Sequence, residues 1–264
     1  MSAPVVEAPA VALEVRGLTG PADGPPSIHD IDLSVPRRAS HLVLGPIHAG
    51  KSMVMRHIVG LEKARSGTVS IRDQQGERQS FDAASVSDAV LRRMRTMIGV
   101  VFEGSALLNR LTVVENIELP LLEHTDATAD QARETARRLL SEVGLDGMND
   151  ELAVAQLSRL DRRRVALARA LALRPSVVLL DEPTLGLDSH SAAELDDTIV
   201  RTQEAGGFAV LIFSNEVRHA FGRAGHIYVM EHGRVVAQGD LDALMRSDQG
   251  LVHRLLHRRA RQQR

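Results

Sequence analysis

The chain has 264 residues and carries 32 Lys and Arg against 34 Asp and Glu, which gives a formal net charge of -2. This balance excludes a strongly basic nucleic-acid-binding protein. Cysteine is absent, which excludes disulfides and thiolate metal sites, and no apolar run reaches the roughly 20 residues that cross a bilayer. The first ten residues have no basic segment followed by an apolar one, so we expect a cytoplasmic location.

The N-terminal part alternates between strand and helix patterns. After a leader at residues 1–10 that we expect to be flexible, the spacing of apolar residues and turn residues predicts three strands, at 11–16, 28–35 and 40–44. An apolar helical face then predicts a helix over 50–60, and strand character returns at 67–72.

The middle of the chain, from about residue 82 to 175, has a helical pattern. Thr128–Gln131 and Ser158–Asp161 have the spacing of capping boxes, which mark helix starts. Gly144 predicts the end of the first of these helices, and the second is expected to end near Leu173. We therefore predict a helical subdomain inserted at about residues 104–173.

The C-terminal part again alternates strands with helices. The continuous apolar run at residues 177–180 is typical of a buried parallel strand. Helices are predicted at 190–205, 216–222 and 240–247, and strands at 208–214, 226–231 and 234–238. This alternation predicts an α/β fold with a mainly parallel sheet, forming a single domain over residues 11–247. Residues 248–264 form a basic tail, which is either a soluble terminus or a contact for anionic lipid headgroups.

Residues Gly45–Ser52 read GPIHAGKS and match the pattern G-x4-G-K-S/T between a strand and a helix, which is the context that the motif requires. In such a loop, backbone N–H groups and the helix N-terminus cradle phosphates, Lys51 reaches the β- and γ-phosphates, and Ser52 holds Mg²⁺. The motif alone is also compatible with a Gly/Pro turn carrying an exposed lysine. We predict that ATP and Mg²⁺ bind here, with contacts from Gly45, Pro46, Ile47, His48, Ala49, Gly50, Lys51, Ser52 and Met53.

The apolar strand at 177–180 leads directly into Asp181 and Glu182. A strand-end Asp-Glu pair is by itself often a solvated turn. Combined with the earlier loop, it predicts that Asp181 binds Mg²⁺ and that Glu182 is the general base for an attacking water.

Together these motifs resemble the nucleotide-binding subunit of an ABC transporter, from Val11 to about Leu256. The matching segments include Val101–Glu103, Leu157–Leu173, Asp181–Asp188 and Ser214-Asn215. The resemblance implies a P-loop NTPase (RecA-like) core, with a mainly parallel sheet, an N-terminal antiparallel β subdomain and an inserted α-helical subdomain. It further implies nucleotide contacts from Ser158 and Asp188.

Within that family, the segments Val101–Leu108 and Leu111–Leu121 look most like the ATPase of MCE/Mla-type phospholipid transport systems, and the segment Asp248–Val252 looks similar too. That likeness implies a membrane permease, an MCE-type substrate-binding protein, and lipid as the transported molecule. It also implies a homodimer or heterodimer of ABC subunits, peripheral on the cytoplasmic face of the inner or plasma membrane.

The sequence departs from the family pattern at several motifs. The signature, usually Leu-Ser-Gly-Gly-Gln, reads Leu157-Ser-Arg-Leu-Asp161, and His48 replaces a usual glycine of the phosphate loop. Glu103 replaces the glutamine that senses Mg²⁺ and water, and would add a third carboxylate beside Asp181 and Glu182. Asn215 replaces the switch histidine. No aromatic residue between positions 15 and 29 could stack on adenine.

Two functions therefore remain open. Lys51, Ser52, Asp181 and Glu182 favour an ATPase that drives a permease. Arg159, Leu160, Glu103 and Asn215 favour a weak or inactive nucleotide-binding partner of another subunit. Arg159 is either a compensating phosphate ligand or an ordinary surface arginine. A soluble ABC protein that acts on nucleic acid is disfavoured, because such proteins usually carry two nucleotide domains.

Overall fold

The computed structural model describes residues 10–21, 27–215 and 224–246. A four-stranded antiparallel sheet contains β1 (Val11–Thr19), β2 (Ile31–Pro36), β4 (Ser66–Arg72) and β5 (Arg78–Asp82), in the order β2-β1-β4-β5. Alternate residues of β1, such as Leu13 and Val15, are buried, while Arg16 is exposed. The sheet therefore has one face on the core and one on the solvent.

The second sheet is the parallel core of the molecule. Its strands are β3 (Ser40–Leu44), β6 (Ile98–Val101), β7 (Val177–Asp181), β8 (Ala209–Ser214), β9 (His226–Glu231) and β10 (Arg234–Gly239). The order is β10-β9-β3-β8-β7-β6, and only β10 runs antiparallel to its neighbour. Every residue of β7 and β8 is buried, as expected for strands covered on both faces.

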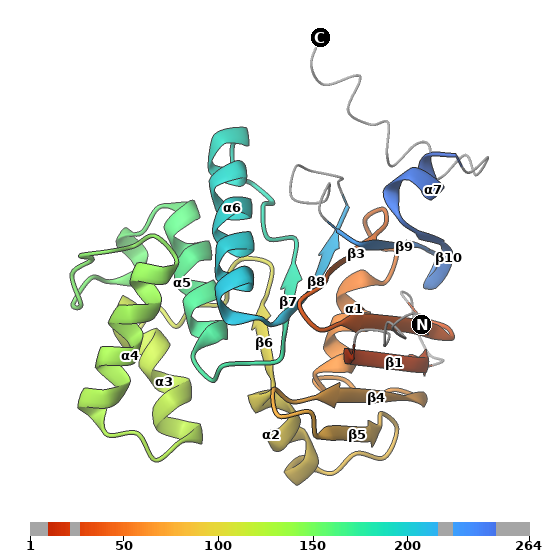
Figure 1. Cartoon of the computed structure of the whole chain (residues 1–264), viewed down its shortest axis with the longest axis horizontal. Helices are drawn as coiled ribbons and strands as arrows, with labels where there is room; N and C mark the ends of the chain where they lie inside the picture. Colours follow the sequence, from red (N-terminus) through yellow and green to blue (C-terminus); the bar gives the residue numbers. More distant parts are fainter. Residues whose placement is uncertain (1–9, 22–26, 216–223, 247–264) are drawn as a thin grey trace, which may run out of the picture.

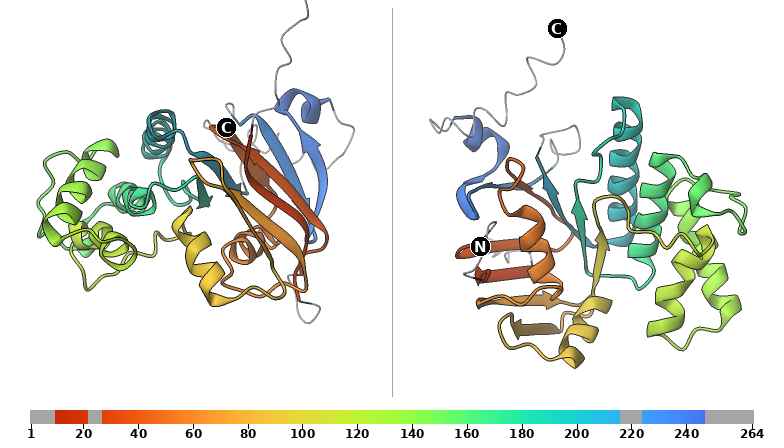
Figure 2. Two further views of the ribbon diagram at one scale, coloured as in Figure 1. Left: turned by 60° about the horizontal axis from the view of Figure 1, so that its bottom comes forward. Right: turned by 180° about the vertical axis from the view of Figure 1, so that it is seen from behind.

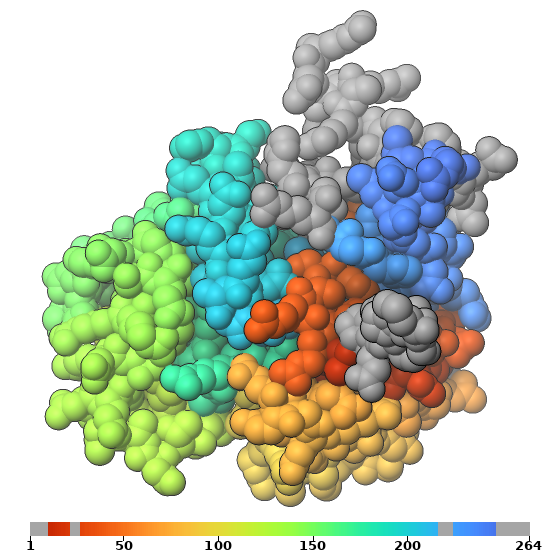
Figure 3. Space-filling model, viewed as in Figure 1, coloured from red at the N-terminus to blue at the C-terminus, as the bar shows by residue number. Residues whose placement is uncertain are grey.

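The helices cover this sheet and extend away from it. They are α1 (Lys51–Ile58), α2 (Asp88–Thr96), α3 (Val113–His124), α4 (Ala129–Glu142), α5 (Arg159–Leu171), α6 (Ser189–Gly206) and α7 (Leu241–Met245), with a short 3-10 helix at Val154–Gln156. Figure 1 shows α3 and α4 at the end of the molecule remote from the antiparallel sheet, with α5 and α6 between them and the parallel sheet. The two further views in Figure 2 show the same arrangement. In the space-filling view, the green helical segment stands to one side as a lobe (Figure 3).

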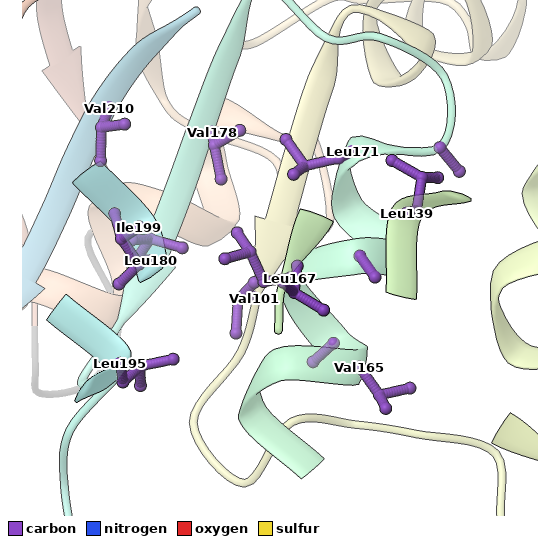
Figure 4. Close-up of a cluster of buried hydrophobic side chains, with 14 of the residues drawn as sticks. Val101, Leu139, Val165, Leu167, Leu171, Val178, Leu180, Leu195, Ile199 and Val210 are labelled. Carbon is purple, nitrogen blue, oxygen red and sulfur yellow. The ribbon is translucent and has the colours of Figure 1, made fainter. Parts of the chain in front are cut away.

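Two hydrophobic clusters hold these layers together. In one, Leu167 of α5 and Ile199 of α6 pack with β-strand residues such as Val101 and Leu180 (Figure 4). In the other, α1 contributes buried residues between the antiparallel sheet and the parallel sheet. Helix α1 is therefore fixed on both sides, which fixes the loop that precedes it. No helix among the described residues has the length and apolarity to cross a bilayer.

The predicted fold class is confirmed, and several boundaries need correction. The region predicted to be helical from about 82 contains β6, and the sequence pattern does not predict β5. Four-residue β6 is too short to show a period, and its burial comes from strand pairing with β7 and packing on α5. The segment 28–35 becomes strand only from Ile31, and the helix predicted to end near Leu173 ends at Leu171.

The expected capping box at Ser158 is only half formed, because Asp161 accepts a hydrogen bond from the Ser158 hydroxyl at 2.7 Å. The reciprocal box at Thr128 is present. Residues 1–9 of the leader, the helix expected at 216–222 and the basic tail lie outside the described residues. The limits of the domain and of the helical subdomain stay predictions.

Candidate functional site

The candidate site lies where four parallel strands end. The register pairs Leu44 of β3 with Ser214 of β8, Asp181 of β7 with Phe213, and Val101 of β6 with Leu180. The loop that begins at Gly45, the carboxylates of Asp181 and Glu182, and Asn215 therefore come to one edge of the sheet. Ligands of open α/β sheets bind at this carboxyl edge.

The loop from Gly45 to Gly50 needs glycine at both ends. A Cβ added to Gly45 would lie 2.5 Å from the carbonyl oxygen of Met230. Gly50 has a φ of +98°, and a Cβ added there would lie only 2.9 Å from Ile28 Cγ2. A residue other than glycine would force backbone to move at the first position and would be strained at the second. His48 also has a positive φ, of 67°, and its side chain is exposed.

The N-terminus of α1 has no side-chain cap. Its N-cap residue is Gly50, which makes no side-chain hydrogen bond. In the described part of the chain, each of the other α-helices begins at a residue whose side chain accepts a first-turn amide: Ser87, Thr112, Thr128, Ser158, Asp188 and Asp240. The first-turn N–H groups of α1 have no acceptor within the helix, so this helix start fits a phosphate.

Lys51 directly follows this start and is 6% exposed. Its ammonium donates hydrogen bonds to the carbonyl oxygens of Gly45 at 2.9 Å and Pro46 at 3.1 Å, and lies 3.6 Å from Glu182 Oε1. Burial lowers the pKa of Lys51, and the charges of Glu182 and Asp181 oppose that shift. The buried cation therefore lies against the loop and beside the carboxylates.

Asp181 and Glu182 are both buried, and each accepts a hydroxyl hydrogen bond. Ser52 donates to Asp181 Oδ1 at 3.2 Å, and Ser214 donates to Glu182 Oε2 at 3.1 Å. Burial raises the pKa of both carboxyl groups. A hydroxyl and a carboxylate oxygen this close together are ligands that Mg²⁺ prefers, so the pair fits that metal ion.

Backbone hydrogen bonds further hold Glu182 in place. It has a φ of 43°, its N–H donates to the carbonyl oxygen of Phe213 at 2.8 Å, and its carboxylate accepts the backbone amide of Asn215. These contacts fix a carboxylate with a raised pKa at the sheet edge, which is the form that a general base for water takes.

The sequence patterns do not predict one buried side chain of this region. Arg163 of α5 is 8% exposed and donates to the carbonyl oxygens of Phe102 at 3.2 Å and Leu185 at 3.4 Å. The available signal was an arginine in the run 162–164 on a helix with an apolar face. The exposed Glu103 follows Phe102 at the end of β6.

Ser158 and Asp188 do not belong to the loop from Gly45 to Gly50 and are the N-cap residues of α5 and α6. Ser158 caps α5 by accepting the Asp161 amide at 3.1 Å, and Asp188 caps α6 by accepting the amides of His190 and Ser191. The guanidinium of Arg159 donates to the carbonyl oxygen of Gly186 at 3.1 Å. Arg159 is therefore bonded within its own chain.

A parallel sheet with a glycine-flanked loop before a helix defines a P-loop NTPase fold. The family model for the ABC transporter matches residues 28–185. The phosphonates import ATP-binding protein PhnC of Bordetella parapertussis is 36% identical over 247 residues, covering 89% of this chain and 95% of that protein. The probable ribonucleotide transport ATP-binding protein mkl of Mycobacterium leprae is 30% identical, with 94% of this chain and 70% of that protein covered.

The chain therefore belongs to the ABC transporter family, as an ATP-binding domain. Among solved structures, the dimeric ATP-binding cassette MJ0796 bound to ADP and Pi is similar, with a TM-score of 0.73 at 25% identity. That likeness covers 87% of this chain and 98% of MJ0796. The cbiO1 protein of Clostridium perfringens, part of the complex cbiONQ, has the same fold with a TM-score of 0.75 at 23% identity.

Proposed function

We propose that this chain binds MgATP at the carboxyl edge of its parallel sheet and couples nucleotide binding and hydrolysis to a membrane permease. In this proposal, the backbone from Gly45 to Met53 cradles the phosphates and Lys51 reaches the β- and γ-phosphates. The single observation that carries it is the uncapped start of α1, since each of the other described α-helices has an N-cap side chain that accepts a first-turn amide.

The chemistry of the site divides among a few residues. Ser52 and Asp181 hold Mg²⁺, which neutralises phosphate charge when bound. Glu182 accepts a proton from the attacking water. The Ser214 hydroxyl and the backbone N–H of Asn215 orient the Glu182 carboxylate. In this proposal, Glu103 would act on the metal and the Asn215 side chain on the γ-phosphate.

Nucleotide binding is tested by calorimetric titration with MgADP. Lys51→Ala should weaken binding by at least tenfold, because a buried cation that meets phosphate is lost. The matched control is Lys63→Ala, which removes an exposed lysine beyond the end of α1. Saturable binding that is equal in both variants would overturn the proposal.

The permease would dock in a groove of about 430 Å³ between the end of β6 and the helical region. Its apolar lining includes Leu61, Val100, Phe102, Leu119, Pro120 and Leu173. An apolar groove beside the end of β6 suits a short amphipathic helix of the permease, and it would link that helix to Glu103. This docking would hold the chain on the cytoplasmic face of the membrane.

Co-purification with the permease tests the groove. Leu119→Glu should abolish it, because a charge would be placed in an apolar contact. Leu122→Glu is the control, since Leu122 lies on the same helix and is 46% exposed. Equal loss of the permease from both variants would contradict the assignment of the groove.

We propose lipid as the transported molecule, with an MCE-type substrate-binding protein as a further partner. Support comes from the resemblance of residues 101–108 and 111–121 to MCE/Mla-type ATPases. The relatives described above are named for phosphonates and ribonucleotides, so uptake assays on cells lacking this chain should compare lipid, phosphonate and nucleoside substrates. Unchanged lipid transport in those cells would exclude the lipid assignment.

A second candidate function is a catalytically weak subunit that pairs with a different, intact ABC subunit. The observation that favours it is the start of α5, where Ser158 and Arg159 are bonded within the chain. A partner with an intact signature would then complete the phosphate loop of this chain. Mixing the chain with such a subunit should raise ATP turnover, whereas mixing it with more of itself should not.

A further inference from the structure

The segment that follows β6 is fastened to α5 by two arginines. Arg163 donates to the carbonyl oxygen of Phe102, and Arg169 donates to those of Ser105 at 3.1 Å and Ala106 at 2.9 Å. Ser105 and Ala106 have φ values of 72° and 48°, a conformation that non-glycine residues adopt only when contacts hold it. Figure 4 shows the apolar side of the same junction, where Val101 of β6 lies beside Leu167 of α5.

The two arginines differ in their surroundings. The guanidinium of Arg163 also donates to the carbonyl oxygen of Leu185, which lies three residues beyond Glu182. Arg163 therefore links the segment that follows β6 to the segment that follows β7. Arg163 interacts electrostatically with the carboxylates of Glu103 and Asp181. For Arg169, burial is the cause that lowers the pKa, whereas for Arg163 the charges of Glu103 and Asp181 oppose the effect of burial. Arg169 therefore holds the segment through hydrogen bonds to carbonyl oxygens. Arg163 holds it in the same way and also has carboxylates of opposite charge nearby.

This edge of the sheet carries three carboxylates whose negative charges need compensation. Glu103, Asp181 and Glu182 converge on one edge of the sheet, and the charge of Glu103 raises the pKa of Asp181 after burial does. Like charges that converge in a partly buried site repel one another unless a cation lies between them. Lys51 compensates Glu182 at 3.6 Å. Arg163 is placed to compensate the other two.

We propose that Arg163 is the positioning residue for Glu103: it holds the start of the loop at Phe102 and compensates the Glu103 carboxylate beside Asp181. The proposal rests on the proposed nucleotide site, and it explains how this chain carries a glutamate at a position next to two further carboxylates. Glu103 and Arg163 then act as one unit, so that changing either alone disturbs the site more than changing both.

The test is a double-mutant cycle with Glu103→Gln and Arg163→Gln on the full chain, at constant pH. The probe is ADP, measured once with EDTA and once with excess Mg²⁺. Without Mg²⁺, Arg163→Gln should weaken ADP binding by about tenfold, because uncompensated carboxylates repel the nucleotide. The double variant should return to within a factor of about two of the wild-type affinity. With Mg²⁺ the effect of Arg163→Gln should shrink, since the metal then supplies positive charge.

Arg169→Gln is the matched control, because it removes carbonyl contacts to the same segment without removing a partner of Glu103. Its effect on ADP affinity should be equal with and without Mg²⁺ and should multiply with that of Glu103→Gln. Arg163→Lys keeps the charge and loses one carbonyl contact, so it should retain the Mg²⁺ dependence of the wild type. Equal behaviour of the Arg163 and Arg169 variants would overturn the proposal.

Urea unfolding of the same four proteins of the cycle, in the absence of nucleotide, separates this proposal from the nucleotide site itself. Non-additive unfolding midpoints support the pairing of Glu103 with Arg163 even if ADP does not bind. Additive midpoints together with additive affinities would exclude it. Loss of ADP binding in the wild type would instead refute the proposed function and leave the unfolding cycle to decide the pairing.

Discussion

The N-termini of α1 and α5 differ in whether a side chain caps them. At α1 the N-cap is Gly50, with a φ of +98° and no side-chain hydrogen bond. At α5 the N-cap is Ser158, whose hydroxyl accepts the Asp161 amide and donates to the Asp161 carboxylate. A helix start that is capped by its own side chain has fewer amides for an external anion than one that is not. The difference supports phosphate binding at α1 and argues against the same contact at α5.

Replacing Gly50 by alanine should have the largest effect. A Cβ there is strained by the φ of +98° and lies 2.9 Å from Ile28 Cγ2. We expect a loss of about 2 kcal/mol in the free energy of unfolding and a nucleotide affinity at least about 100-fold lower, equivalent to about 2.7 kcal/mol. Calorimetry and urea unfolding measure both quantities.

Gly76→Ala is the control for backbone strain alone. Gly76 has a φ of +97°, and nothing lies within 4 Å of an added Cβ. This variant should lose stability without losing nucleotide affinity. If Gly50→Ala bound nucleotide as well as Gly76→Ala does, the start of α1 would not be the phosphate site.

The second prediction concerns turnover. The isolated chain should hydrolyse ATP at least about 100-fold more slowly than a relative with an intact signature, which is the scale of one lost donor to developing charge. Combining Arg159→Gly, Leu160→Gly and Asn215→His should raise the rate, because the first two remove side chains and the intrachain bond to Gly186 at the start of α5. Phosphate release assays measure the rate.

Glu182→Gln is the control for this series and should abolish whatever turnover remains. A wild-type rate equal to that of the intact relative would contradict the weak-site interpretation. A triple variant with no gain would locate the limit at His48, at Glu103 or at the missing adenine-stacking ring instead.

The third prediction uses pH to act on the strand that carries the phosphate loop. His41 of β3 is 7% exposed and packs against His226 and Tyr228. Burial, and then the charge of His226, lower the pKa of His41 from 6.5 to about 4. The unfolded chain therefore binds a proton before the folded chain does, and stability is complete above pH 6.5 and is lost as the pH falls toward 4.

After allowance for screening by solvent, this loss should reach about 2 kcal/mol near pH 4. Urea unfolding between pH 7 and pH 4 measures it. His41→Phe removes the titrating group, so the difference between the variant and the wild type should grow as the pH falls. Parallel pH profiles would show that another group causes the loss.

The smallest effect is expected at the start of α5. Ser158→Ala should lower the free energy of unfolding by about 1 kcal/mol, the usual contribution of a serine N-cap. Because Ser158 caps its own helix, nucleotide affinity of the isolated chain should not change. A tenfold loss of affinity would mean that α5 contacts the nucleotide within one chain, and the contrast between the two helix starts would fail.

Local sequence patterns are enough to predict the glycine-flanked loop before α1, the Asp181-Glu182 pair at the end of β7 and the α/β class. These patterns are a glycine spacing between a strand and a helix, an apolar run that ends in Asp-Glu, and alternating strand and helix periods. The helix start at Thr128 is predictable for the same reason, because a capping box is a contact between residues three positions apart.

Contacts between distant segments determine how these motifs are arranged relative to one another. The strand β6, the placement of Arg163 between Phe102 and Leu185, and the bond from Arg159 to Gly186 join residues that are 22 or more positions apart. The parallel register brings Leu44, Asp181 and Ser214 to one edge of the sheet. A one-dimensional pattern carries no information on which buried cation will face which carboxylate, because burial and charge pairing are set by the packing of α5 on the sheet.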